Sequence, residues 1–309
     1  GSGRLVSRPM GAYEALFKDY YERLTDDELP VRIHGPIQAG TFSLRGDISS
    51  QYVSGLLFAL PLLGGDSTIH LTSPLESRGY VDLTMHCLND FGIDIARDEN
   101  TYFIKGNQVY RPLEKEIEGD YSQAAFWIAA AIIGDQIEIS NLNHQSLQGD
   151  KVMVDYAMEM GAKIAMTRHG YRVMPSKTNG IAIDLKDCPD LGPILMILAA
   201  ASDGESRLTG FKRLTYKESD RLSAMVDILK KLGVKIDHLT DELIIEGRPN
   251  FIGNQIFHAY QDHRIVMALA IAAIHADGPI TIMDAEAITK SYPHFFDDYT
   301  KLGGVIHVD

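Results

Sequence analysis

Gly46-Asp47-Ile48-Ser49-Ser50-Gln51 is the stretch that decides the fold, because related stretches recur at regular spacing along the chain. The other three are Glu118-Gly119-Asp120-Tyr121-Ser122-Gln123, Cys188-Pro189-Asp190 and Gln261-Asp262-His263-Arg264. Their aspartates, at positions 47, 120, 190 and 262, are about 70 to 73 residues apart. Self-similarity at a fixed period indicates a repeated supersecondary unit.

Each of these aspartates precedes a helix rich in small and apolar residues, a composition that predicts burial on all sides. The four helices are expected at 52–63, 124–133, 191–201 and 265–274. A short strand follows each, and in three copies an amphipathic helix then ends at a glycine before a hairpin: Gly92, Gly161 and Gly233. The unit is therefore βαβαββ.

The repeat predicts a mixed α/β (α+β) protein. Three units are expected between about 38 and 247, and a fourth runs from about 250 until the pattern stops at 308. Residues 8–33 have the pattern of the second half of a further unit, so the sequence is expected to start within a unit. A chain of 309 residues exceeds the usual size of one hydrophobic core, and two domains are the default expectation.

Composition narrows the function classes. The formal net charge of −13 disfavours a nucleic-acid partner, because phosphate-backbone binding needs a basic face. The longest apolar stretches, 124–133 and 265–274, are about half as long as a membrane-spanning helix, and no signal peptide is recognised. We expect a cytoplasmic protein that binds no membrane, and reduced thiols at Cys87 and Cys188.

Cations at predicted helix starts point to an anion-binding site. Acidic residues are favoured in the first turn of a helix, yet five basic residues occur at or just before such starts: Arg8, Lys217, Arg221, Arg264 and Lys290. Solvated surface charge would explain any one of them; phosphate and carboxylate ligands would explain the set. Asp120 and Asp150 are interpreted as helix caps.

The densest motif is Lys217-Glu218-Ser219-Asp220-Arg221. A cap needs only one Ser or Asp, so two cations around an acid exceed a capping role. A carboxyl held there beside a bound anion could exchange protons with a substrate.

Four ordered motifs resemble the EPSP synthase family of enolpyruvyl transferases: 46–52, 217–221, 262–265 and 290–293, with Arg8-Pro9-Met10 also fitting. The similarity covers the chain after residue 3. It implies an inside-out barrel fold of two globular domains, each of three βαβαββ units, with residues 4–116 as a partial first domain and 117–309 as the second. The hinge is expected at 112–118.

The resemblance also implies a reaction. The family transfers the enolpyruvyl group of phosphoenolpyruvate to the 5-hydroxyl of shikimate 3-phosphate, giving EPSP and phosphate through a tetrahedral intermediate. It implies no metal, no cofactor and a monomer. Asp190 matches the carboxylate that accepts the hydroxyl proton, and Glu218 the acid that protonates the methylene carbon.

The binding residues are likewise implied by the resemblance. Those for phosphoenolpyruvate are Arg8, Gln51, Arg221, Arg264 and Lys290. Those for shikimate 3-phosphate are Ser49, Ser50, Gln51, Ser77, Tyr80, Asp190 and Lys217. His263 is expected to position its neighbours.

Two departures from the family pattern qualify this expectation. The family's N-terminal stretch, with a catalytic lysine and a glycine-rich loop, has no counterpart, which predicts weak or no activity for this chain. Arg213 stands where the family often has asparagine, and it is left unassigned. The alternatives are a UDP-N-acetylglucosamine enolpyruvyl transferase and a non-catalytic anion-binding fragment; Ser49-Ser50-Gln51 and the 217–221 motif favour the shikimate enzyme.

Overall fold

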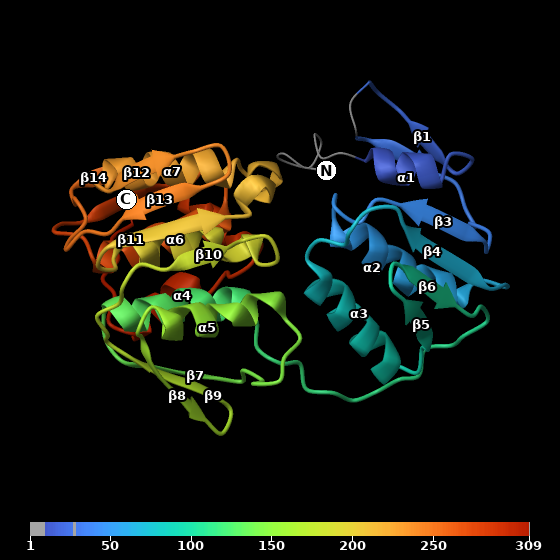
Figure 1. Cartoon of the computed structure of the whole chain (residues 1–309), viewed down its shortest axis with the longest axis horizontal. Helices are drawn as coiled ribbons and strands as arrows, with labels where there is room; N and C mark the ends of the chain where they lie inside the picture. Colours follow the sequence, from blue (N-terminus) through green and yellow to red (C-terminus); the bar gives the residue numbers. More distant parts are fainter. Residues whose placement is uncertain (1–9, 27–28, 309) are drawn as a thin grey trace. The chain divides into compact units, whose positions relative to one another are not determined.

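The computed structural model describes residues 10–26 and 29–308 (Figure 1). Arg8 lies outside the described residues. The chain divides into two compact units. Unit 1 contains residues 1–117 and 147–149, and unit 2 contains residues 118–146 and 150–309. The division after residue 117 lies one residue beyond the expected domain boundary.

Unit 1 contains one complete βαβαββ repeat. It begins with α1 (Gly11–Leu16) and an antiparallel pair, β1 (Tyr21–Arg23) and β2 (Val31–Ile33). The repeat follows as β3 (Thr41–Leu44), α2 (Ser50–Ala59), η2 (Leu60–Leu62), β4 (Ser67–Leu71), α3 (Arg78–Asp90), β5 (Ile95–Asp98) and β6 (Thr101–Ile104). Its sheet has the order β3-β4-β6-β5, with β3 parallel to β4 and the other pairs antiparallel.

Unit 2 contains a second complete repeat of the same topology. Its elements are β10 (Ala182–Asp184), η4 (Pro189–Leu191), α6 (Gly192–Ala200), β11 (Glu205–Thr209), η5 (Phe211–Tyr216), α7 (Arg221–Lys231), β12 (Lys235–His238) and β13 (Leu243–Glu246). The sheet order, β10-β11-β13-β12, repeats that of unit 1. The predicted unit is therefore confirmed twice.

The repeat before it is shorter than predicted. It consists of α4 (Tyr121–Ile133), β7 (Ile137–Ser140), η3 (Gly149–Lys151), α5 (Val152–Glu159), β8 (Lys163–Thr167) and β9 (Gly170–Met174), in a three-stranded sheet β7-β9-β8. No strand forms in 105–120, so the expected first strand of this copy is wrong. Pro112 and the run Glu114-Lys115-Glu116 interrupt any alternating apolar pattern there.

The last copy ends early, as the pattern predicted. Strand β14 (Gln255–His258) precedes α8 (His263–Ile274), and β15 (Ile280–Met283), which is parallel to β14, follows it. The chain continues with η6 (Ala285–Lys290) and α9 (Phe295–Lys301). The predicted glycine stops are confirmed, since Gly92, Gly161 and Gly233 all have the left-handed backbone, with φ of 82°, 101° and 83°.

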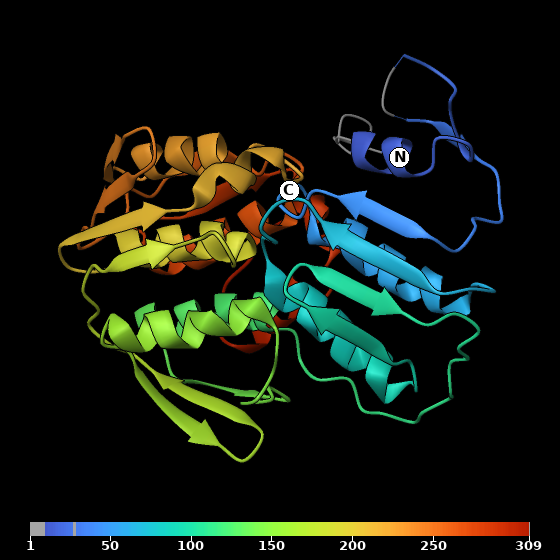
Figure 2. The same cartoon turned by 45° about the vertical axis from the view of Figure 1, so that its right-hand side comes forward.

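The core of unit 2 is built on α4, α6 and α8, which contact one another (Figures 1 and 2). All nine residues of α6 are buried, as are eleven of the thirteen in α4. Here the prediction of all-round burial is confirmed. No helix within 10–26 and 29–308 is long and apolar enough to span a bilayer.

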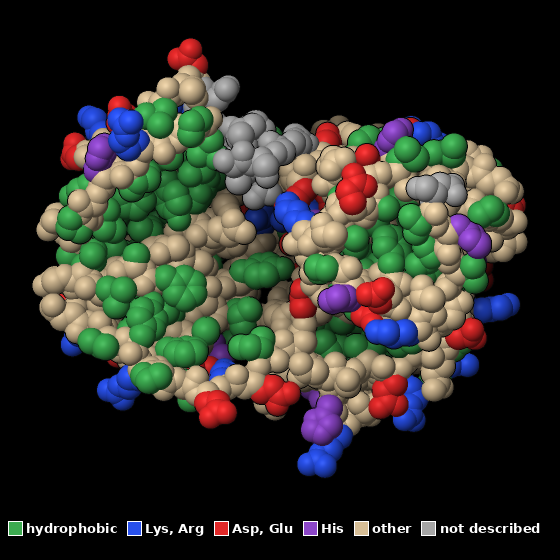
Figure 3. All heavy atoms as spheres, turned by 180° about the vertical axis from the view of Figure 1, so that it is seen from behind, with side chains coloured by type: hydrophobic (Ala, Val, Ile, Leu, Met, Phe, Trp, Pro, Cys, Tyr) green, Lys and Arg blue, Asp and Glu red, His purple; other side chains and the backbone are tan. Residues whose placement is uncertain are grey.

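In unit 1 the same prediction is wrong for α2. Val53 and Leu57 are buried, but Phe58 is 47% exposed and Leu62, in η2, is 54% exposed. In the described part of unit 1, α2 packs on the amphipathic helix α3, and no fully apolar helix lies beside it. Hydrophobic side chains accordingly gather on the surface of unit 1 (Figure 3).

Candidate active site

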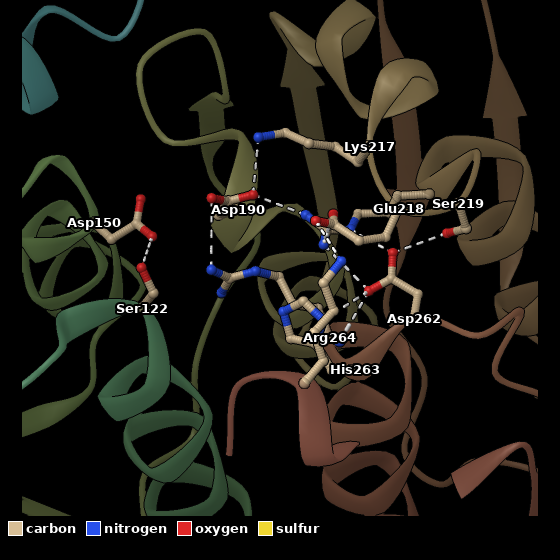
Figure 4. A network of polar contacts seen from close by, with 11 residues as sticks. Ser122, Asp150, Asp190, Lys217, Glu218, Ser219, Asp262, His263 and Arg264 are labelled. Atoms are coloured by element: carbon tan, nitrogen blue, oxygen red, sulfur yellow. Dashed lines mark hydrogen bonds and ion pairs between the residues drawn. The ribbon is translucent and has the colours of Figure 1, made fainter. Parts of the chain in front are cut away.

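The N-terminal ends of α4, α6 and α8 bring polar residues together in unit 2 (Figure 4). We define the charged cluster as Asp190, Lys217, Glu218, Arg221, Asp262, Arg264 and Lys290. These residues come from η4, the segment before α7 and its first residue, the start of α8 and the end of η6. The cluster thus joins segments that are up to 100 positions apart in the sequence.

Arg221 lies at the centre of the charged cluster, with 1% of its side chain exposed. Its Nε donates to Asp262 Oδ2 (2.8 Å) and its Nη1 to Asp190 Oδ1 (2.8 Å). Its Nη2 donates to Glu218 Oε2 (2.7 Å) and Asp262 Oδ1 (3.2 Å). Burial disfavours the charge, but Asp262 and Asp190 outweigh it and raise the pKa of Arg221. Three carboxylates are therefore held in fixed positions by one guanidinium.

Asp190 is paired with three cations. Besides Arg221, Lys217 Nζ lies 3.0 Å from Oδ1 and Arg264 Nη2 lies 3.5 Å from Oδ2. Burial favours the protonated acid, but Arg264, Lys217 and Arg221 outweigh it and lower the pKa of Asp190. The carboxyl is therefore ionised at neutral pH and available to accept a proton.

Glu218 is shared between a buried and an exposed cation. Arg221 holds Oε2, and Lys290 Nζ, on a side chain 54% exposed, lies 3.0 Å from Oε1. Burial favours the neutral acid, but Arg221 and the Lys290 hydrogen bond lower the pKa of Glu218 to about 2. Because Lys290 is exposed, it can turn toward a ligand.

Arg264 is the cation with the most unused donors. Its Nη2 faces Asp190, while Nε and Nη1 are buried without a hydrogen-bond partner among the described residues. A buried donor without a partner costs about 1–3 kcal/mol, and such groups need an explanation. An anion bound beside Arg264 would satisfy both donors.

Asp262 and His263 support the charged cluster from the start of α8. Asp262 is fully buried and caps α8, accepting from Arg264 N (3.0 Å) as well as from Arg221 and Ser219. Burial lowers the pKa of His263 to about 4, so its imidazole is neutral at pH 7. The expectation that His263 positions its neighbours stays a prediction.

The remaining candidate residues lie in unit 1, at the starts of two helices. Ser49 caps α2, accepting from Gln51 N (3.3 Å), Ser50 is buried, and Gln51 is exposed. Ser77 is buried just before α3, and Tyr80 lies in its first turn. Ser77 has a left-handed backbone (φ 51°), a conformation that costs a serine on the order of 1 kcal/mol and often marks functional sites. Their substrate contacts stay predictions.

One of the two predicted caps is wrong. Asp120 caps α4 by accepting from Ser122 N (2.8 Å), as expected. Asp150 makes no capping bond to α5; its Oδ2 instead accepts a short hydrogen bond from Ser122 Oγ. The competing partner is a hydroxyl on another helix, which sequence spacing cannot reveal. Among the described residues, no group of three or more His, Cys, Asp and Glu could hold a metal ion.

A sequence model of one family, EPSP synthase (3-phosphoshikimate 1-carboxyvinyltransferase), matches residues 1–299. The chain belongs to the EPSP synthase family. Proteins named 3-phosphoshikimate 1-carboxyvinyltransferase from Clostridium acetobutylicum and Clostridium kluyveri are 44% and 43% identical to it, over 99% of the chain and 72% of their own length.

Solved structures agree with this membership of the EPSP synthase family. EPSP synthase from Acinetobacter baumannii superposes with a TM-score of 0.82 and 26% identity, covering all of this chain and 74% of the other. The enolpyruvyl transferase NikO from Streptomyces tendae shares the fold alone, with a TM-score of 0.76 at 18% identity, over 98% of this chain and 73% of its own. The predicted α/β fold class and family resemblance are confirmed.

Proposed function

We propose that this chain transfers the enolpyruvyl group of phosphoenolpyruvate to the 5-hydroxyl of shikimate 3-phosphate, giving EPSP and phosphate. Family membership supports this reaction. One observation supports the charged cluster as the place of the catalytic residues. Its two reactive carboxylates, Asp190 and Glu218, are each paired with cations that an anionic substrate could take over.

Substrate binding would then change the proton affinity of both carboxylates. Lys217 and Arg264 now lower the pKa of Asp190, and Lys290 lowers that of Glu218. An incoming phosphate or carboxylate competes for these cations. As they turn to the substrate, Asp190 and Glu218 become stronger bases, because an opposite charge nearby favours the ionised form.

Asp190 and Glu218 carry the protons of the reaction. The acceptor hydroxyl oxygen forms a bond to C2 of phosphoenolpyruvate while its proton passes to Asp190. Glu218, having taken up a proton after Lys290 left it, delivers that proton to C3, and the tetrahedral intermediate forms. When the C2–O bond to phosphate breaks, the bonding electron pair leaves with the phosphate, which takes up the proton held by Asp190. C3 returns a proton to Glu218, and the enolpyruvyl double bond is restored.

The proposed substrate contacts form two sets, one for each substrate. Arg264, Lys290, Arg221 and Arg8, which is not among the described residues, are proposed for phosphoenolpyruvate, with Gln51. Ser49, Ser50, Ser77, Tyr80 and Lys217 are proposed for shikimate 3-phosphate, with Gln51 and Asp190. We also propose a monomer in the cytoplasm.

The test compares shikimate 3-phosphate with UDP-N-acetylglucosamine as acceptor. Calorimetry measures the binding of each, and an assay with phosphoenolpyruvate measures the release of phosphate. The chain spans 72% of the length of the two relatives, so binding is measured as well as turnover. Binding of shikimate 3-phosphate, and phosphate release only in its presence, is expected. Binding of UDP-N-acetylglucosamine alone would transfer the assignment to the rival enzyme, and binding of neither would contradict both.

Glu218→Gln separates binding from chemistry. It removes the acid and releases Lys290, so phosphoenolpyruvate should bind at least as tightly as in the parent. Phosphate release should fall by about 100-fold or more, the usual effect of removing a general acid. Weaker binding with unchanged release would contradict the role of Glu218.

A further inference from the structure

Asp150 is a buried carboxylate that the proposed mechanism does not use. It is 1% exposed, and its Oδ2 accepts from Ser122 Oγ, itself buried. Its Oδ1 is buried with no hydrogen-bond partner among the described residues. An acid in this position is costly unless its charge is compensated or it takes up a proton.

The charged groups facing Asp150 come from three neighbouring segments (Figure 4). Asp190 on η4 disfavours its ionised form, and Arg264 on α8 favours it. From the start of α4, the Ser122 hydrogen bond favours the ionised form and Asp120 opposes it. Cys188 also faces it, but burial and the surrounding carboxylates raise that thiol's pKa and keep it neutral. The adjacent Lys151 is turned away, with its Nζ on His144 O (2.7 Å).

Arg264 links Asp150 to the anion site. Its Nε and Nη1 and Asp150 Oδ1 are all buried polar atoms without hydrogen-bond partners in the described chain. Within the charged cluster, four cations face three carboxylates, so the seven side chains sum to +1. An ionised Asp150 brings that sum to zero, whereas a protonated Asp150 leaves +1 for a ligand.

We propose that Asp150, held by Ser122, is a further residue of the anion site, and that it takes up a proton when an anion binds beside Arg264. It is a positioning residue, because it acts through Arg264 and need not touch the ligand. The proposal rests on the anion-binding role proposed for the charged cluster. It adds a residue and a proton that the proposed reaction does not require.

Its pKa favours Asp150 over the neighbouring titratable groups as the proton acceptor. Burial, together with Asp190, raises its pKa to about 6, while the pKa of Glu218 is about 2 and that of His263 about 4. A bound anion raises the pKa of Asp150 further. Protons are therefore taken up between the pKa of the free protein and that of the complex, and anion affinity falls as pH rises through this interval.

Inorganic sulfate is a suitable probe, because it carries two charges throughout pH 5–8 and itself releases no proton. Calorimetric titrations in two buffers of different ionisation enthalpy give the number of protons taken up. The parent should take up about half to one proton per sulfate near pH 6.5 and almost none at pH 5, where Asp150 is already protonated.

Two variants identify the acceptor. Asp150→Asn should lower the uptake near pH 6.5 by about half a proton or more relative to the parent, because any proton taken up by Glu218 is common to both proteins. It should raise sulfate affinity at pH 8 by at least about fivefold, since a buried negative charge is gone. Ser122→Ala removes only the hydrogen bond that favours the carboxylate, so it should move the uptake maximum to higher pH. A role in packing alone would not produce that shift.

The outcomes are distinguishable. Unchanged proton uptake in Asp150→Asn, or sulfate binding by the parent without uptake at pH 6.5, would overturn the role of Asp150 and leave the proposed function intact. If the parent bound neither sulfate nor phosphoenolpyruvate, the anion site itself would be contradicted.

Discussion

Helices α2 of unit 1 and α6 of unit 2 occupy the same place in the repeat but have different surroundings. All of α6 is buried, because α4 and α8 pack beside it. In the described part of unit 1, α2 buries one face only and leaves Phe58 exposed. The same packing brings the starts of α4, α6 and α8 together, where the charged cluster forms. Helix packing, and not the helix sequence alone, therefore assembles the site.

The largest expected effect comes from placing a charge inside α6. Leu195→Asp puts a carboxylate at a position with no exposure, where it has no partner, and should destabilise unit 2 by at least about 4 kcal/mol. Trp127, the only tryptophan, is buried in α4, so its fluorescence follows urea unfolding of unit 2. A loss below about 1 kcal/mol would show that the three helices do not pack as described.

The second effect concerns the charged cluster that this packing supports. Arg221→Met removes the cation and leaves Asp262 buried beside Asp190, which should cost about 3–5 kcal/mol. The matched control is Lys290→Met, whose side chain is 54% exposed and should cost less than about 1 kcal/mol. Equal losses in the two variants, followed by Trp127 fluorescence, would refute the central position of Arg221.

The smallest effect is expected on α2. Phe58→Asp replaces a side chain that is 47% exposed and should change the unfolding free energy of unit 1 by no more than about 0.5 kcal/mol. Val53→Asp, on the buried face of the same helix, should cost several times more. Hydrogen exchange of the α2 amides measures both. A large loss for Phe58→Asp would mean that another part of the protein covers this face.

The sequence predicted the repeat well, because periodic aspartates, apolar helices and stop glycines are local signals. Sequence-based predictions are wrong where packing against distant segments determines the structure. No strand forms at 105–120, before α4, and the all-apolar pattern of α2 does not show whether helices lie beside it. Burial follows from neighbours that a single segment does not encode.

For the candidate site, sequence motifs identified the charged residues but not their pairing. The 217–221 motif predicted an anion site, yet Asp262 was not recognised as the main partner of Arg221. The sequence predicts Asp150 as a cap because it precedes a helix. It does not reveal the bond to Ser122, because the two residues are 28 positions apart. Each of these contacts depends on helices meeting in the fold.

A crystal structure with phosphoenolpyruvate is the most direct test of anion binding at the charged cluster. We expect the ligand's phosphate or carboxylate oxygens within hydrogen-bond distance of Arg264 and Lys290, with Lys290 turned away from Glu218. Ligand bound away from both cations, with the Lys290–Glu218 and Arg264–Asp190 pairs unchanged, would contradict it.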